Sequence, residues 1–206
     1  MKIIVVGTGF VGLTHAATTS EYGHEVYAYD IDKARIEAYK SGDPDRIEHY
    51  VNEPGLAQVI EDNIDRYLFF TTEIEPIIEG TDALFLCLPT PPNPNGSSDL
   101  SYYMDALHHI AGLLAKRKDQ RRVVLINKST VPIGTGRKLE AILKEHNVPN
   151  AGIASNPEFL PEGDAVEKSR KPDRVVVGAD TEEDFRILRR IYSQFVNHVR
   201  IRYIET

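Results

Sequence analysis

Three glycines near the start of the chain have the spacing that most directly indicates chemistry. They follow an apolar run at residues 2–6 and precede a stretch that is compatible with a helix. In such a strand–turn–helix unit the first glycine permits a tight turn, the second lets a pyrophosphate approach the backbone, and the third lets the helix pack closely on the strand. The helix start then offers N–H groups to the anion. The pattern predicts a dinucleotide site formed by Gly7, Gly9, Phe10, Val11 and Gly12.

An acid follows the second apolar run, at residues 25–29. Asp30 lies about 20 residues beyond the glycines, where an acid accepts hydrogen bonds from the adenosine ribose and disfavours a 2′-phosphate. This position favours NAD over NADP. Arg35 complicates the assignment, because a nearby arginine can bind a 2′-phosphate, but we expect it to lie beside the adenosine without reversing the preference. The alternative is a glycine-rich turn that holds no ligand.

Two further apolar runs, at residues 123–126 and 152–155, end in polar loops. If both runs are parallel strands, their carboxyl ends open into one crevice, the usual ligand site of such sheets. Thr130 would offer a hydroxyl there, and Glu158 and Glu162 would offer carboxylates that can hold a water or accept a proton. Spacing alone favours the plainer interpretation, in which each is only a polar loop residue.

A proline-rich segment at residues 89–98 follows another predicted strand at the same edge. Its prolines prevent helix formation and strand pairing. We expect it to form a wall over the cofactor; the alternative is a stiff surface connection.

The elements that must position these residues alternate along the chain. Apolar runs bounded by turn residues are typical of strands buried on both faces of a parallel sheet. The predicted fold is α/β, a Rossmann-like, doubly wound, mostly parallel sheet with helices on both faces. We predict strands near residues 2–6, 25–29, 67–71, 82–87, 122–126, 151–155, 173–177 and 198–203, and helices near 10–22, 32–41, 54–64, 73–79, 101–116, 134–146 and 181–195.

Composition narrows the function classes. The 206 residues are 41% hydrophobic and 27% charged, with a net charge of −7, which is typical of a soluble domain and argues against a nucleic-acid partner. No apolar run reaches membrane-spanning length, so we expect no membrane partner and a cytoplasmic location. The one basic cluster, residues 116–122, is expected to be a solvated connection.

Metal and thiol chemistry receive little support from the sequence. The single cysteine, Cys87, excludes an intrachain disulfide, and we expect it to act as a small hydrophobic residue at the end of a buried strand. His108 and His109 are adjacent on a predicted helix and point to different faces. No set of His, Asp or Glu has spacing typical of a metal site, so no metal is predicted.

Several motifs follow one another along nearly the whole chain. Besides the glycine turn, they are residues 53–56, 89–90, 99–100, 129–132, 156–160, 162–163 and 172–178. In this order they resemble the UDP-glucose/GDP-mannose dehydrogenase family, specifically its N-terminal NAD-binding domain, and the later motifs are more specific than the glycine turn. Within the family they are most similar to UDP-glucose 6-dehydrogenase.

The resemblance implies an enzyme that oxidises the C6 alcohol of a nucleotide sugar, most simply UDP-glucose to UDP-glucuronate, with two NAD and a thioester on a cysteine. It also implies roles for individual residues. Asp30 and Arg35 would contact the adenosine ribose, while Pro89, Thr90, Ser129 and Thr130 would line NAD. Thr130, Glu158 and Glu162 would be catalytic, and Glu158, Phe159, Leu160 and Glu162 would contact the substrate.

The resemblance also implies parts that residues 1–206 do not contain. The family's nucleophilic cysteine, its catalytic lysine, its long central helix and its nucleotide-sugar-binding half would follow the C-terminal residue. We therefore expect residues 1–206 to be the NAD-binding domain of a longer enzyme, homodimeric or larger, and to bind NAD(H) without turnover. The alternatives are a GDP-mannose or UDP-N-acetyl-hexosamine dehydrogenase domain, another NAD-dependent enzyme of this fold such as a hydroxyacid dehydrogenase, and a stand-alone, non-catalytic NAD-binding module.

Overall fold

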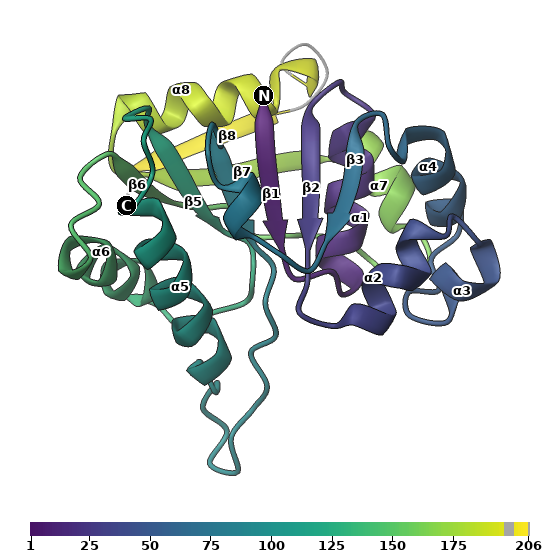
Figure 1. Cartoon of the computed structure of the whole chain (residues 1–206), viewed down its shortest axis with the longest axis horizontal. Coiled ribbons are helices and arrows are strands. Elements are labelled where there is room, and N and C mark those ends of the chain that lie inside the picture. Colours follow the sequence, from purple (N-terminus) through teal and green to yellow (C-terminus); the bar gives the residue numbers. More distant parts are fainter. Residues whose placement is uncertain (196–199, 206) are drawn as a thin grey trace.

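One eight-stranded sheet forms the centre of the computed structural model, which describes residues 1–195 and 200–205 (Figure 1). The strand order is β3-β2-β1-β4-β5-β6-β7-β8, so the chain crosses from one side of β1 to the other after β3. The strands are β1 (Lys2–Val6), β2 (Glu25–Tyr29), β3 (Leu68–Thr71), β4 (Ala83–Leu86), β5 (Val123–Asn127), β6 (Ala151–Ser155), β7 (Arg174–Ala179) and β8 (Arg200–Glu205).

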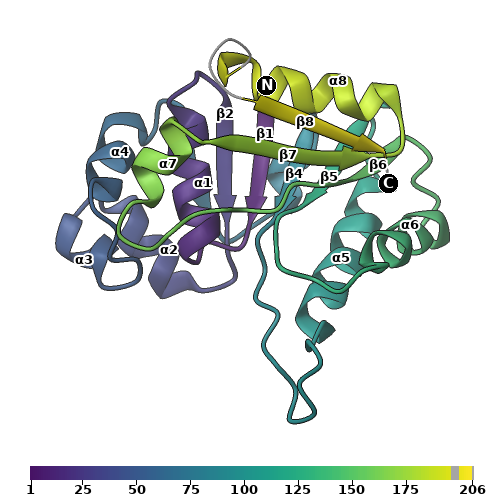
Figure 2. The same cartoon turned by 180° about the vertical axis from the view of Figure 1, so that it is seen from behind.

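The first six strands run parallel, which confirms the predicted sheet type. The last two reverse direction: β7 pairs antiparallel with β6, and β8 pairs parallel with β7. Figure 2 shows these two strands crossing in front of the parallel set. Residues 198 and 199 of the last predicted strand lie outside the described residues.

Helices cover both faces of the sheet because buried strand residues alternate between two cores. Ile3 and Val5 of β1 pack with the helices of one face, whereas Ile4 and Val6 pack against α5, α6 and the segment around Ile77 on the other. The helices are α1 (Phe10–Ser20), α2 (Lys33–Lys40), α3 (Pro44–Glu48), α4 (Leu56–Asn63), α5 (Ser101–Leu114), α6 (Thr135–Glu145), α7 (Ala165–Arg170) and α8 (Glu182–Ile191), with 3₁₀ turns η1 (Glu75–Ile77) and η2 (Ser193–Phe195).

Three short elements differ from the prediction. The helix expected over residues 73–79 is only the 3₁₀ turn η1, which contains Pro76 and is too short for an apolar period. Helices α3 and α7 were not predicted. The start of α3 nevertheless carries clear signals, because the Asp43 side chain accepts the backbone N–H of Asp45 and Pro44 occupies the first turn.

The proline-rich segment does not form a wall along its whole length. It folds back on itself as a narrow loop, in which Pro92 pairs with Ser98 and the Asn93 N–H donates to the Ser97 carbonyl at 2.7 Å. Figure 1 shows this loop projecting away from the sheet. Only the first residues, Pro89 and Thr90, line the cleft described below, so the rest of the segment does not form the expected wall.

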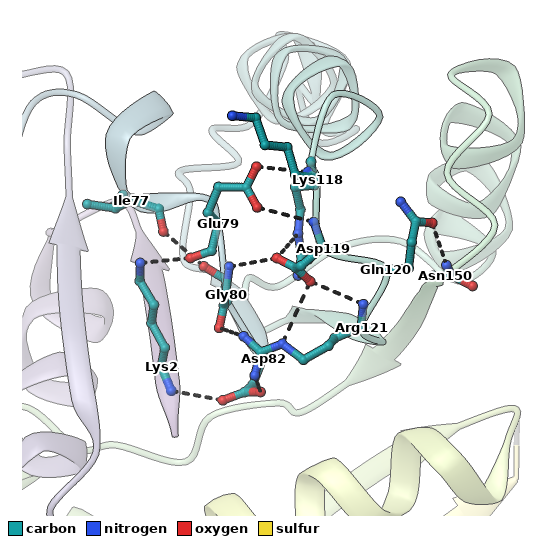
Figure 3. A network of polar contacts seen from close by, with 12 residues as sticks. Lys2, Ile77, Glu79, Gly80, Asp82, Lys118, Asp119, Gln120, Arg121 and Asn150 are labelled. Carbon is teal, nitrogen blue, oxygen red and sulfur yellow. Dashed lines mark hydrogen bonds and ion pairs between the residues drawn. The ribbon is translucent and has the colours of Figure 1, made fainter.

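The expectation that residues 116–122 form a solvated connection holds for Lys116, Lys118, Gln120 and Arg121, which are exposed, but not for Arg117 or Arg122. Arg117 is 7% exposed and pairs with Asp119, whose carboxylate also accepts the Gly80 N–H at 2.8 Å. Arg122 makes two 2.9 Å hydrogen bonds to the buried Asp184. Figure 3 shows the contacts of Asp119, which tie the segment after α5 to Gly80, shortly before β4. Arg117 is held by an acid two residues away, whereas Arg122 is held by an acid 62 residues away.

Candidate functional site at the carboxyl edge of the sheet

The main candidate site is a cleft where the strand order reverses. Here β1 and β4 lie side by side, and their following loops leave in opposite directions, the usual ligand position in doubly wound sheets. The cavity measures about 870 Å³. It is lined by residues following β1, β2, β4 and β5, together with residues of α5, and Glu158 after β6. The sheet thus brings segments that are distant in sequence to one edge.

The three glycines have distinct structural requirements. Gly7 has φ +91°, and an added Cβ would lie 2.5 Å from the Cys87 carbonyl oxygen. A Cβ on Gly12 would lie 1.9 Å from the Gly7 oxygen, so no side chain fits there. A Cβ on Gly9 would meet nothing within 4 Å, and this residue lines the cleft. Gly9 therefore keeps open a space that a ligand can use.

The start of α1 faces the same space. Gly9 is the N-cap residue, no side chain caps the helix, and its first turn contains no acid. The positive end of the helix dipole is thus available to a phosphate, and the backbone can approach closely. These features fit a dinucleotide pyrophosphate.

Asp30 is held by donors from two segments. One of its carboxylate oxygens accepts the Thr8 N–H at 2.8 Å and the Thr8 hydroxyl at 2.9 Å, and the other accepts the Asp32 N–H. Burial alone would raise the pKa of Asp30, but these hydrogen bonds and the Arg35 charge outweigh it and lower the pKa below its ordinary value. Asp30 is therefore ionised at neutral pH. The sequence did not single out Thr8, although it occupies a variable position of the glycine motif.

Arg35 pairs with two carboxylates. Its guanidinium lies 3.1 Å from Asp30 and 3.9 Å from Asp32. It lines the cleft beside Asp30, and the two acids oppose its positive charge. An anion entering here would meet two acids for one arginine, which disfavours a 2′-phosphate.

The far end of the cleft joins the loops after β4 and β5. The Thr90 hydroxyl donates to the Thr130 carbonyl at 2.9 Å, and the Ser129 hydroxyl donates to the Leu88 carbonyl at 2.7 Å. Pro89, Thr90, Ser129 and Thr130 all line the cavity. These contacts fix the predicted cofactor-lining residues relative to one another.

Lys128 is a buried cation that the sequence analysis did not identify. Its ammonium donates to the Asn156 side-chain oxygen at 3.1 Å, and burial lowers its pKa, although Cys87 and Glu158 oppose that shift. Lys128 and Glu158 line the main cleft and both neighbouring cavities. The two residues therefore stand where the cleft meets the loops after β5 and β6.

The predicted site residues in the loop after β6 lie in different places. Glu158 and Thr130 line the same cleft, whereas Phe159 and Leu160 line an adjacent cavity of about 500 Å³. Phe159 is 49% exposed, and its ring lies 4.4 Å from the Arg174 guanidinium carbon. Glu162 is exposed and is not among the residues lining these two cavities.

Glu53, which is distant in sequence, holds the end of this loop by hydrogen bonds. It is 2% exposed, and its carboxylate accepts the Gly163 N–H at 2.8 Å and the Ala165 N–H at 2.6 Å. The sequence identified residues 53–56 as a family motif but assigned no role to them. The structure shows that Glu53 anchors the segment running from Glu158 into α7.

Cys87 lies at the end of β4 and packs against the core. Burial raises the pKa of its thiol to about 12, so the thiol is protonated at neutral pH. This agrees with a small hydrophobic role and not with an activated nucleophile.

Together, the reversed strand order, the glycine cradle and the buried acid after β2 define a Rossmann-type dinucleotide-binding domain. Residues 1–196 match the UDP-glucose/GDP-mannose dehydrogenase family, NAD binding domain, and the chain belongs to this family. Its cofactor is NAD, and the cradle just described fits that cofactor.

Relatives and solved structures agree with this assignment. The chain is 37% identical to the UDP-glucose 6-dehydrogenase of Rhizobium meliloti over 87% of its own length and 40% of that protein. It aligns with a UDP-glucose dehydrogenase structure from Pyrobaculum islandicum with TM-score 0.88, 32% identity, and coverage of 99% and 46% of the two chains. The corresponding values for a GDP-mannose dehydrogenase from Pseudomonas aeruginosa are 0.86, 26%, 100% and 46%. The chain thus spans less than half of each.

Among the helices that the structure describes, none combines the length and the apolar character needed to cross a membrane.

Proposed function

We propose that residues 1–206 form the NAD-binding domain of a longer, cytoplasmic and at least dimeric enzyme that oxidises the C6 alcohol of UDP-glucose to UDP-glucuronate with two NAD. The observation that carries the proposal is that Glu158 and Thr130, from two separate strand ends, line the cleft that fits the cofactor. The similarity to UDP-glucose 6-dehydrogenases supports this substrate over others.

In this proposal, NAD accepts a hydride in each of two oxidation steps. Gly7, Gly9, Phe10, Val11 and Gly12 bind the pyrophosphate through the backbone and the α1 dipole. Asp30 accepts the ribose hydroxyls and Arg35 lies beside the adenosine. Pro89, Thr90, Ser129 and Thr130 line the other half of the cofactor.

Thr130 and Glu158 would orient the water that releases the acid from a thioester. A carboxylate can accept a proton from that water, and a hydroxyl can position it. Phe159, Leu160 and Glu162 would contact the sugar, with Glu162 assisting catalysis. The exposed position of Glu162 requires its loop to meet substrate or another part of the enzyme. Lys128 would hold the loop after β6 through Asn156.

The thioester needs a cysteine from outside this chain. Cys87 is unsuited because burial raises its thiol pKa to about 12. The isolated chain should therefore bind NAD(H) and show no turnover.

GDP-mannose is the second candidate substrate, because the Pseudomonas aeruginosa GDP-mannose dehydrogenase structure aligns almost as well. A UDP-N-acetyl-mannosamine substrate is favoured less, with a TM-score of 0.84 and 25% identity to the Pyrococcus horikoshii UDP-D-ManNAc dehydrogenase structure. A non-catalytic NAD-binding module remains the alternative of a different class.

The test is to determine the reading frame that follows codon 206 and to assay the complete polypeptide. NADH formation should be measured with UDP-glucose, GDP-mannose and UDP-N-acetyl-mannosamine at equal concentrations. We expect the highest kcat/KM with UDP-glucose and two NADH for each acid formed. A higher kcat/KM with GDP-mannose would reassign the substrate. A stop codon directly after codon 206 would favour the non-catalytic module.

A further inference from the structure

Two histidines and a glutamate meet outside the cofactor cleft, between α5 and the end of α6. The ring nitrogens His108 Nδ1 and His146 Nε2 lie 3.1 Å apart. The ligand atoms of His108, Glu145 and His146 all lie within 4.8 Å of one another. The sequence predicts no such group, because 38 residues separate the two histidines and only the packing of α5 on α6 brings them together.

We propose that His108, Glu145 and His146 form a binding site for a divalent transition-metal ion of the Zn²⁺ class. Two imidazole nitrogens and one carboxylate oxygen are a donor set that suits Zn²⁺, Co²⁺ or Ni²⁺, whereas Mg²⁺ and Ca²⁺ prefer oxygen ligands. Water would occupy the remaining position.

The distance between the two nitrogens is close to what such an ion needs. Nitrogen ligands of tetrahedral Zn²⁺, each about 2.0–2.1 Å from the metal, lie about 3.3 Å apart. The observed 3.1 Å separation requires an adjustment of only a few tenths of an ångström. The Glu145 carboxylate must come closer, which its exposed and flexible side chain allows.

The electrostatic setting also favours a cation. Glu145 is the last residue of α6 and His146 is its C-cap. The carbonyl groups at a helix C-terminus carry partial negative charge, which stabilises a cation placed there. The Glu145 carboxylate adds a full negative charge.

Gly112 of α5 lies next to the His146 ring. It lies one turn after His108, and an added Cβ would sit 3.7 Å from His146 Nδ1. A larger side chain at this position would displace the ring while leaving all three ligands in the chain. The site would link α5 to α6 at a distance from the cleft, so its expected effect is on stability and not on chemistry.

Calorimetric titration of the tag-free chain with ZnCl₂ tests the proposal. We expect one saturable Zn²⁺ per chain and a rise in melting temperature on addition of Zn²⁺. His108→Gln and His146→Gln should each weaken binding at least tenfold, and Glu145→Gln should weaken it by a smaller factor. The matched control is His109→Gln, which removes the neighbouring exposed histidine and should leave binding unchanged.

Gly112→Leu provides a second test that deletes no ligand and replaces a mid-helix glycine with a better helix former. It should lose Zn²⁺ binding while remaining folded by circular dichroism. The absence of saturable Zn²⁺ binding to the wild-type chain would overturn the proposal. So would binding that survives both histidine substitutions, or binding that His109→Gln reduces as much as they do.

Discussion

At the scale of single residues, Asp30 is the residue that we expect to determine the choice between NAD and NADP. Thr8 and Asp32 fix the carboxylate by hydrogen bonds, and Arg35 pairs with it at 3.1 Å. The acid is therefore ionised and oriented before any ligand arrives. Because Asp30 and Asp32 oppose the positive charge of Arg35, this arginine should attract a 2′-phosphate only weakly.

This arrangement predicts that the chain binds NAD(H) at least tenfold more tightly than NADP(H), a difference of about 1.4 kcal/mol. Asp30→Asn should weaken NAD(H) binding and narrow the preference, because it removes the ribose acceptor and releases Arg35 toward a 2′-phosphate. Calorimetric titration with both cofactors measures each affinity. Asp45→Asn, an exposed change in α3, is the control. Equal wild-type affinities would refute the ribose role of Asp30.

A second residue-scale prediction concerns Glu158 and Thr130 in the complete enzyme. If they orient the hydrolytic water, Glu158→Gln should slow acid release about 100- to 10,000-fold while affecting the first hydride transfer less. Thr130→Ala should act on the same step more mildly, because a hydroxyl is a poor base. Rapid-quench experiments should then trap a covalent sugar–enzyme adduct.

Glu162→Gln distinguishes the role of Glu162 from that of Glu158, since only Glu158 of the two lines the cofactor cleft. Slow acid release in Glu162→Gln would assign Glu162 a catalytic role. Wild-type acid release in Glu158→Gln would contradict the assignment of Glu158. If both residues only shape their loops, the variants would lose NAD affinity or stability without accumulating an adduct.

At the scale of elements, two glycines in the turn between β1 and α1 have different roles: we expect Gly12 to be needed for folding and Gly9 for cofactor binding. Replacing each of them with valine should distinguish the two roles. Gly12→Val places a side chain 1.9 Å from the Gly7 oxygen and should cost about 1–3 kcal/mol or more in free energy of unfolding. A Cβ at Gly9 meets no atom within 4 Å and the residue has an ordinary φ of −71°, so Gly9→Val should stay folded but lose NAD binding. Urea denaturation and NAD titration provide the two measurements. Unchanged NAD affinity in Gly9→Val would contradict the cradle.

Glu53 connects the segment before α4 to the start of α7, and this connection can be tested with a matched control variant. Glu53→Gln weakens a buried acceptor of two backbone N–H groups and should lower the free energy of unfolding by about 1–3 kcal/mol. Residues 156–164 should also become more sensitive to limited proteolysis. Glu48→Gln, an exposed change at the end of α3, should alter neither measurement. If both variants behave alike, the Glu53 carboxylate does not hold the loop.

Local patterns predicted those elements whose causes lie within about 20 residues. The glycine turn, β2 and the capped start of α8 at Thr181 could be read from spacing alone. The antiparallel direction of β7 could not, because it depends on the path of residues 156–173 across the sheet. The site was also incomplete in the sequence: the Lys128–Asn156 and Glu53–Ala165 contacts span 28 and 112 residues, and only tertiary packing creates them.

At the scale of the whole molecule, the chain carries a cofactor cleft but only part of the proposed reaction. It spans 40% of the Rhizobium meliloti enzyme and 46% of the Pyrobaculum islandicum chain. Its one cysteine, Cys87, is half-buried at the cleft, and desolvation raises the pKa of its thiol to about 12. Cofactor binding and covalent catalysis should therefore be separable.

The last prediction follows from this division. The chain incubated with UDP-glucose and NAD should produce no NADH above background, although calorimetry on the same sample should show NAD bound. Cys87→Ser should change neither result, because a buried, protonated thiol is a poor nucleophile. Turnover that persists in Cys87→Ser would mean that the reaction needs no cysteine, and the proposed thioester route would be wrong. Turnover abolished by Cys87→Ser would instead make Cys87 the nucleophile, which would require the pKa of its thiol to fall when ligands occupy the cleft that it lines.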